Sequence, residues 1–213
     1  MSTHSNLDSF YNFFKHNGSE RFRGLDESHF IGLSKNEKEI AWKFLEEKFE
    51  SSVERIRGLY ILDRPRAIEL FKRALSMPME NAEFAADRLE VESARLLMLK
   101  CVNNIEPDER YLIELLEFAT SEFEEVRAEF ASSVPAKKII PEAIDALKCM
   151  IFTEVERVPL ASAVGKLMAI YGLDFDLNDS FYKSIYRSLR LGNIEEKKSA
   201  VSRLEKCQNP DYI

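Results

Sequence analysis

The sequence predicts an all-α protein, and three observations support that prediction. Only 7 glycines and 7 prolines occur among 213 residues, which leaves little room for the turns of a many-stranded sheet. From Ser34 onward, apolar residues recur at helical spacing almost without interruption. No stretch alternates strictly between apolar and polar residues within boundaries typical of a strand. The composition, 45% hydrophobic and 31% charged, is that of an ordinary globular chain.

Residues 1–33 are expected to form an N-terminal cap on a helical body that spans residues 34–213, with the whole chain as a single domain. Four aromatic residues lie between Phe10 and Phe14, and a stretch punctuated by glycines follows them. This pattern predicts a short helix and an irregular connection. Two interpretations of the rings remain open: they cover one end of the body, or they form an exposed anchor for a partner.

Local signals mark the ends of the helices in the body. Ser34 and Glu37 form a capping box, and Asp63 with Pro65 starts a later helix. Pro107 opens another helix, Gly172 ends one in the left-handed conformation, and Gly192 is a second stop of that kind. Ten helices result, in five short-linked pairs. They span residues 34–49, 51–62, 63–76, 80–102, 107–120, 121–134, 139–152, 155–171, 178–191 and 195–207.

The pairs resemble one another. Residues 127–134 (RAEFASSV) and 157–164 (RVPLASAV) share the pattern Arg-x-x-apolar-Ala-Ser-small-Val at an offset of thirty residues. Residues 55–62 are a looser copy, with Gly58 as the small residue. Small residues at helix crossings let neighbouring backbones approach closely, so we expect Ala131 and Ala161 to be buried.

The segment 109–134 (ERYLIELLEFATSEFEEVRAEFASSV) resembles a HEAT repeat, with an apolar first helix, a short turn and a Val-Arg that opens the second helix. Residues 139–165 resemble the next repeat. The resemblance implies an α-α superhelix of about five stacked antiparallel helix pairs, of the HEAT or armadillo kind, with a short N-terminal capping segment. It also implies that the second helix of each pair lies on the concave side.

Nothing in the sequence predicts an enzyme. It has no motif for nucleotide binding, nucleophilic hydrolysis or zinc peptidase chemistry, and its histidines all lie in the cap, which indicates surface residues. No catalytic, cofactor-binding or metal-ligating residue is predicted, and no small-molecule substrate is evident. Trp42 is expected in the core rather than on a ligand.

The chain is expected in the cytoplasm. Its first residues carry no basic and apolar signal, and no apolar run approaches the roughly 20 residues of a membrane span. Cys101, Cys149 and Cys207 are predicted to be free thiols in a reducing compartment.

Charge is distributed unevenly along a chain whose net charge is −7. Residues 106–129 hold nine acidic and two basic side chains, whereas residues 183–207 hold seven basic and three acidic ones. The acids are either a solvated surface or a field that steers a basic partner. The candidate partner-binding residues are Asp87, Glu90, Glu122, Glu125 and Glu129.

These observations favour a non-catalytic protein-binding module. Its most specific form is an inhibitor that covers a basic, nuclease-type toxin, because small HEAT-like proteins are found among bacterial immunity proteins. A general adaptor or scaffold is the alternative. A nucleic-acid binder similar to the HEAT-like DNA glycosylases is third, because the acids at 80–129 repel phosphate.

Overall fold

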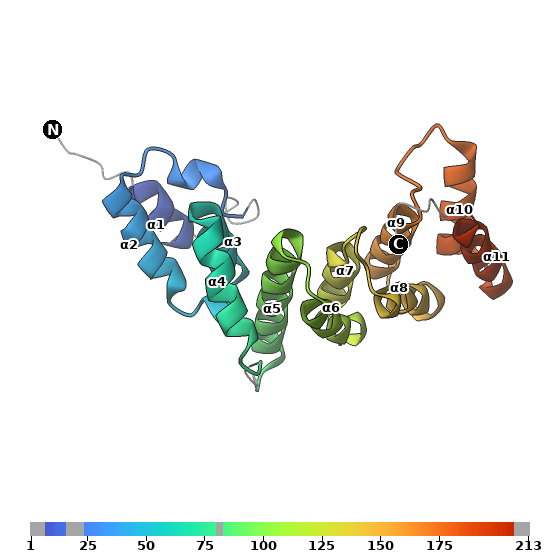
Figure 1. Ribbon diagram of the computed structural model, residues 1–213, viewed down its shortest axis with the longest axis horizontal. Helices are drawn as coiled ribbons and strands as arrows, with labels where there is room; N and C mark the ends of the chain where they lie inside the picture. The colour runs from blue at the N-terminus through green and yellow to red at the C-terminus, as the bar shows by residue number, and fades with distance from the viewer. Residues whose placement is uncertain (1–6, 16–23, 80–82, 207–213) are drawn as a thin grey trace. The chain divides into compact units, whose positions relative to one another are not determined.

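The computed structural model describes residues 7–15, 24–79 and 83–206 (Figure 1). Within these residues it contains eleven α-helices, three 3-10 helices and no strand, which confirms the all-α prediction. No helix in the described ranges combines the length and apolar character needed to cross a bilayer. The chain divides into two compact units, Met1–Cys101 and Val102–Ile213, with the boundary near the end of helix α5.

The first unit contains helices α1 to α4 and most of α5. Helix α3 packs on both α2 and α4, while α1 lies against α2 and η2. Its elements are α1 (Leu7–Lys15), η2 (Glu27–Phe30), α2 (Lys35–Glu46), η3 (Phe49–Ser51), α3 (Val53–Leu62), α4 (Arg64–Leu75) and α5 (Ala85–Ile105).

The second unit contains the remaining helices. Helix α9 packs on α7, α8 and α10, and α11 packs on α10 and α8. Its elements are α6 (Glu109–Leu115), η4 (Leu116–Thr120), α7 (Glu124–Ser133), α8 (Pro141–Thr153), α9 (Arg157–Ile170), α10 (Ser180–Leu191) and α11 (Ile194–Glu205).

Most of the predicted helix ends are confirmed. The Ser34 hydroxyl accepts from the Glu37 amide, the Glu37 carboxylate accepts from the Ser34 amide, and Asp63 caps the helix that begins with Pro65 in its first turn. Gly172 has φ +77°, and the amide of the next residue donates to Met168, as in a Schellman motif.

Two of the predicted end signals, at Pro107 and Gly192, are wrong, and several helix bounds differ: the helix expected over 34–49 ends at Glu46, the one over 80–102 extends to Ile105, and the one over 121–134 begins at Glu124. Helix α6 begins at Glu109 rather than at Pro107, because the Asp108 carboxylate caps it by accepting from the Arg110 amide at 2.9 Å. Gly192 follows α10 with φ −72°, so it is not a left-handed stop. Its lack of a side chain matters for space instead, since a Cβ there would lie 2.3 Å from the Ser188 carbonyl oxygen.

The N-terminal aromatic residues form part of the core of the first unit. Phe10 is 0% exposed and Phe13 is 2% exposed, so the exposed-anchor interpretation is wrong for these two rings. The Phe10 ring contacts those of Phe30 and Phe44, with centroids 5.7 and 5.5 Å away. Trp42 is buried as expected, and its indole donates to Glu46.

A recurring contact joins the two helices of a pair. Arg55 of α3 donates to the carbonyl oxygens of Phe44 and Glu47 at the end of α2. Arg95 of α5 and Arg127 of α7 act in the same way. Arg95 donates to Leu75, the last residue of α4, and to Met77, and Arg127 donates to Ser121 and Glu122 after η4. Each guanidinium therefore satisfies carbonyls that a helix end leaves without partners.

Residues thirty positions apart on α7 and α9 share a sequence pattern but only partly share their burial. Phe130 and Leu160 are both buried, as are Val134 and Val164. Ala131 is 0% exposed, as expected, but Ala161 is only half-buried, so the prediction for Ala161 is wrong. On α9 the fully buried small residue is Ala163, two positions further along.

Candidate functional site

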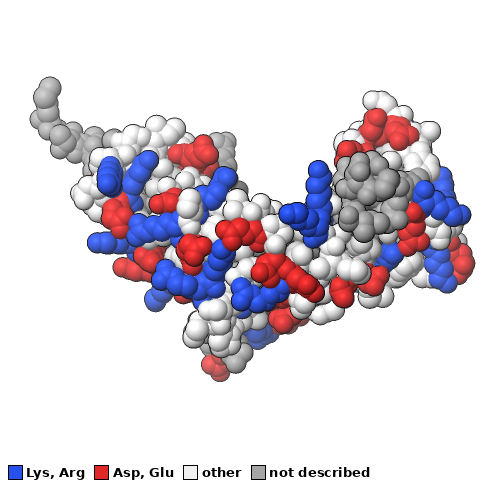
Figure 2. Space-filling model, viewed as in Figure 1, with Lys and Arg blue, Asp and Glu red and all other residues white. Residues whose placement is uncertain are grey.

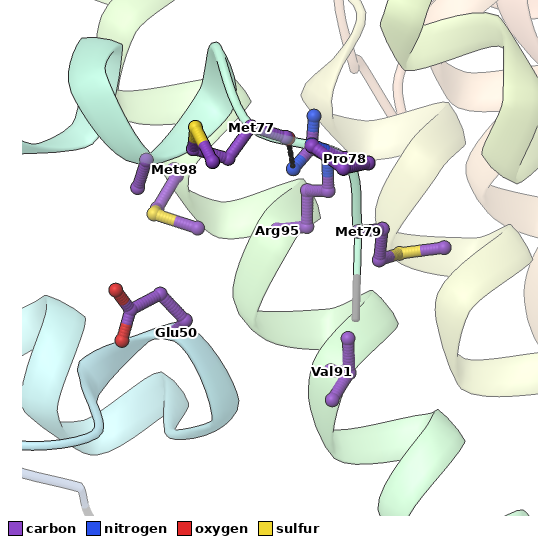
Figure 3. A pocket seen from close by; sticks show the side chains of 8 residues that line it. Glu50, Met77, Pro78, Met79, Val91, Arg95 and Met98 are labelled. Atoms are coloured by element: carbon purple, nitrogen blue, oxygen red, sulfur yellow. Dashed lines mark hydrogen bonds between the residues drawn. The ribbon is translucent and has the colours of Figure 1, made fainter. Parts of the chain in front are cut away.

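The first unit has a pocket of about 340 Å³ next to the turn between α4 and α5 (Figure 3). Met77, Met98 and Val91 give it an apolar lining, and Glu50 of η3 lies on the side opposite Arg95. The remaining lining residues are Ala74, Pro78 and Met79. The sequence analysis did not single out this pocket, although three methionines between residues 77 and 98 are the signal that could have pointed to it.

In the second unit, three of the predicted partner-binding residues lie on or just before α7. Glu125 and Glu129 are four residues apart and lie on one side of the helix, whereas Glu122 lies two residues before its first residue. We call these three residues the acidic row. Glu122 and Glu125 are exposed, while Glu129 is half-buried and accepts hydrogen bonds from the hydroxyls of Ser132 and Ser133.

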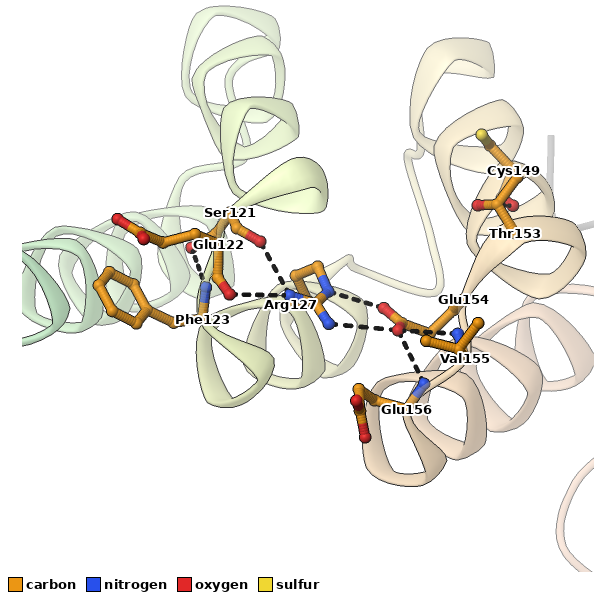
Figure 4. A network of polar contacts seen from close by, with 9 residues as sticks. All are labelled: Ser121, Glu122, Phe123, Arg127, Cys149, Thr153, Glu154, Val155 and Glu156. Carbon is orange, nitrogen blue, oxygen red and sulfur yellow. Dashed lines mark hydrogen bonds and ion pairs between the residues drawn. The ribbon is translucent and has the colours of Figure 1, made fainter. Parts of the chain in front are cut away.

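The only two bases between residues 106 and 129 are both engaged. Arg127 forms two hydrogen bonds with Glu154, from Nε to Oε2 at 2.7 Å and from Nη2 to Oε1 at 3.2 Å (Figure 4). Arg110 lies over the ring of Tyr111 and donates to its hydroxyl at 2.5 Å. Both guanidiniums are therefore held in place.

Glu154 is the centre of a small polar network. Its Oε1 also accepts from the amides of Val155 and Glu156, which precede α9, at 3.0 and 2.9 Å. Hydrogen bonding to Arg127 and to these amides holds the pKa of Glu154 below its ordinary value of 4.5. The network ties the start of α7 to the segment before α9.

Helix α9 has a row of apolar residues that are exposed or half-buried. Val158 is 57% exposed, and Ala161, Gly165 and Ala169 are half-buried at spacings of three and four residues. A Cβ added to Gly165 would meet no atom within 4 Å. We call these four residues the open stripe. Its counterpart on α7, thirty residues earlier, includes Ala128 and Ala131, which are both buried.

The other predicted residues, Asp87 and Glu90, lie on α5 in the first unit and are both exposed. The five predicted residues therefore belong to two units. Glu90 contributes to a second pocket, between the start of α3 and α5. Over α2 to α4, acidic and basic side chains are interspersed rather than separated (Figure 2).

Within the described residues, no group of three or more histidine, cysteine, aspartate or glutamate side chains is arranged to hold a metal ion. His29 caps η2 through hydrogen bonds with Asp26, whereas His4 and His16 lie outside the described residues. Cys101 is buried and Cys149 is exposed, and Cys207 is also outside the described ranges.

Comparisons of the chain with protein-family models, curated proteins and solved structures found no match.

Proposed function

We propose that this chain is a non-catalytic, cytoplasmic helical-repeat protein that binds a basic protein through the second helices of its repeats. The observation that carries the proposal is the acidic row on and just before α7, in the same unit as the open stripe on α9, a helix that packs on α7. Such a surface combines long-range attraction for a basic partner with apolar area that contact would bury.

A HEAT-like superhelix is the arrangement we propose for the helices. It is supported by the arginine contacts of Arg55, Arg95 and Arg127, each reaching from a second helix to the end of the first. The difference in burial between Ala131 of α7 and Ala161 of α9 also fits such stacking. In a repeat array, each second helix offers a stripe to the next one, and the open stripe is a stacking surface of this kind that α9 leaves accessible.

Inhibition of a nuclease-type toxin is the specific form that we favour. A nuclease carries basic residues where it binds phosphate, so an acidic surface can cover that site and block it by occupancy alone. Electrostatic attraction would also speed association, which matters for an inhibitor that must capture its target quickly.

An adaptor function is the second candidate, and the open stripe favours it. Val158 and the small residues around Gly165 could accept an apolar helix of any charge. The two candidates differ in how binding responds to salt and to which variants abolish it.

The decisive experiment is a pull-down from the native host with the tagged chain, eluted in steps of increasing salt and identified by mass spectrometry. One stoichiometric basic protein released by moderate salt supports the inhibitor function. Changing Glu122, Glu125 and Glu129 together to glutamine should then weaken capture, whereas Glu69→Gln on α4, which removes one carboxylate outside the acidic row, serves as a control. Capture that is insensitive to salt and lost in Val158→Asp would support the adaptor function instead.

A further inference from the structure

Helix α10 has a polar face made only of hydroxyl and basic side chains. Its 12 residues include three basic residues and no acidic one. Tyr182, Ile185 and Leu189 are buried on the other side of the helix, which packs on α9 and α11. The residues of the polar face are exposed or half-buried and follow one another at spacings of three and four positions, so they adjoin along the helix. We call them the α10 polar face: Ser180, Lys183, Ser184, Arg187 and Ser188.

The donors at the centre of this face are free to bind a ligand. Lys183, Ser184 and Arg187 are exposed, and none of their side chains forms a hydrogen bond or ion pair within the described residues. Arg190 differs, because its guanidinium lies over the ring of Tyr186 and donates to that hydroxyl at 3.1 Å. The free cations of α10 are therefore Lys183 and Arg187, about one helical turn apart.

The carboxylates next to α10 in sequence are engaged in other contacts. Asp179 caps the helix, since it accepts from the Phe181 amide at 2.8 Å. Glu195 pairs with Lys198 at 3.0 Å. Charges more than about 8 Å away are largely screened at physiological ionic strength. The net charge of −7 of the whole chain therefore does not set the potential at the α10 polar face.

The chemistry of this face matches phosphate oxygens. Basic and hydroxyl side chains are the donors with which proteins contact the backbone of nucleic acids. A membrane is less suitable, because an interfacial helix binds by burying its apolar side in lipid, and that side of α10 is already buried in the protein. A small anion would be held by few contacts, whereas a polymer presents phosphates repeatedly and can engage several donors at once.

We propose that the α10 polar face binds the phosphate backbone of a nucleic acid, independently of base sequence. Lys183 and Arg187 neutralise phosphates, and the Ser184 hydroxyl between them donates a hydrogen bond to a phosphate oxygen. The site includes none of the acidic row. It therefore does not depend on the function proposed for α7, and each proposal can fail without the other.

The test is fluorescence anisotropy of the full-length chain with a fluorescein-labelled DNA duplex of about 20 base pairs, titrated at several concentrations of potassium chloride. We expect binding that weakens as salt increases. The logarithm of the association constant should fall with the logarithm of salt concentration with a slope of about −1.8, since each neutralised phosphate contributes about −0.9. A duplex of unrelated sequence should bind equally well.

Removal of the two free cations makes the test specific. Changing Lys183 and Arg187 together to glutamine should lower the affinity at low salt about tenfold or more and should flatten the salt dependence. The control changes Lys35 and Lys38 of α2 to glutamine, which alters the net charge equally at two exposed positions. This control should leave the affinity nearly unchanged.

Ser184 offers a second comparison, in which charge is the main difference. Ser184→Asp introduces a carboxylate between the two cations and should weaken binding strongly. Ser184→Asn has nearly the same size without the charge and should weaken binding far less. Because Ser184 is exposed, both variants should fold, and circular dichroism checks this.

Three results would overturn the proposal. The duplex could fail to bind at low salt, or the double variants of α2 and α10 could lose affinity equally. Alternatively, vesicles with about one quarter phosphatidylserine could bind through Lys183 and Arg187 while the duplex does not, which would assign the face to a membrane. Changing Glu122, Glu125 and Glu129 to glutamine should not weaken DNA binding, which separates this result from the capture of a basic protein.

Discussion

Arg127 and Glu154 are twenty-seven residues apart and form a two-bonded ion pair that joins the start of α7 to the segment before α9. The side chains are only 16% and 7% exposed, respectively. Each partner has further bonds, the guanidinium to carbonyls after η4 and the carboxylate to amides before α9. Loss of either residue would therefore leave several polar groups of the second unit without partners.

Arg127→Ala or Glu154→Gln should lower the free energy of unfolding by about 2–3 kcal/mol, because removal of one member leaves the other buried and unpaired. Chemical denaturation measures this loss. The control is Glu39→Gln, which breaks the exposed pair with Arg66 and should leave the free energy of unfolding nearly unchanged. If Glu39→Gln lowered the free energy of unfolding as much as a change in the Arg127–Glu154 pair does, a special role for that pair would be contradicted.

The same pair predicts a dependence on pH. Because the pKa of Glu154 is lowered in the folded chain, its contribution to stability is complete above its ordinary value of 4.5 and is lost as pH falls through the folded pKa. The stability difference between the wild type and Glu154→Gln should therefore shrink below about pH 4.5. Denaturation curves of both proteins between about pH 3 and about pH 7 test this dependence. A stability difference that stayed constant over this range would exclude the Glu154 carboxylate as its origin.

The comparison of α7 with α9 gives a matched pair of variants. Ala131→Glu places a charge at a fully buried position and should cost about 3–5 kcal/mol of unfolding free energy. Ala161→Glu, at the corresponding half-buried position, should cost much less because its carboxylate can reach water. Thermal unfolding of both variants measures these losses of stability. If the two variants lost similar stability, the open stripe would be covered rather than accessible.

Two glycines inside helices should respond oppositely to alanine. A Cβ at Gly58 would lie 2.6 Å from a methyl of Leu25 and 2.9 Å from one of Leu45, so Gly58→Ala should destabilise the first unit. Gly165 has open space, and Gly165→Ala should stabilise the chain by about 0.5–1 kcal/mol through helix propensity. Calorimetry of the two variants distinguishes these signs.

The described cysteines should differ in reactivity. Burial raises the pKa of the Cys101 thiol to about 12, so it should resist alkylation at pH 8 until the chain unfolds. Cys149 is exposed and should react in the native state. Peptide mapping after iodoacetamide treatment, in a Cys207→Ser background, checks both. Modification of Cys101 at the same rate as Cys149 would contradict its burial.

Signals confined to one helix end allowed much of the local structure to be predicted. The cap at Ser34 and Glu37 and the stop at Gly172 depend on residues within a few positions of each other, and both were predicted correctly. Gly192 was misassigned because its role is set by space around the turn, including the side chain of Glu196, rather than by its dihedral angle.

Contacts between distant residues could not be predicted in this way. The sequence contains Arg127 and Glu154 but not the register that brings them together across two helices. Ala131 and Ala161 occupy the same place in the repeated pattern, yet their burial differs because it depends on which helix packs alongside each. The methionine-lined pocket likewise depends on how η3 lies against the turn between α4 and α5.

The arginine contacts at the helix ends also bear on the order in which the chain can fold during synthesis. Arg55 lies only 8 and 11 residues beyond the carbonyls it satisfies, and Arg127 lies 5 and 6 residues beyond its own. Each of these helix ends can therefore be completed soon after it leaves the ribosome. Lys197 reaches the carbonyl of Ile151 across 46 residues, so the end of α8 is completed only when α11 has emerged. The pairs joined by Arg55 and Arg127 can close one by one, whereas the bond from α11 to the end of α8 forms only after the last pair has emerged.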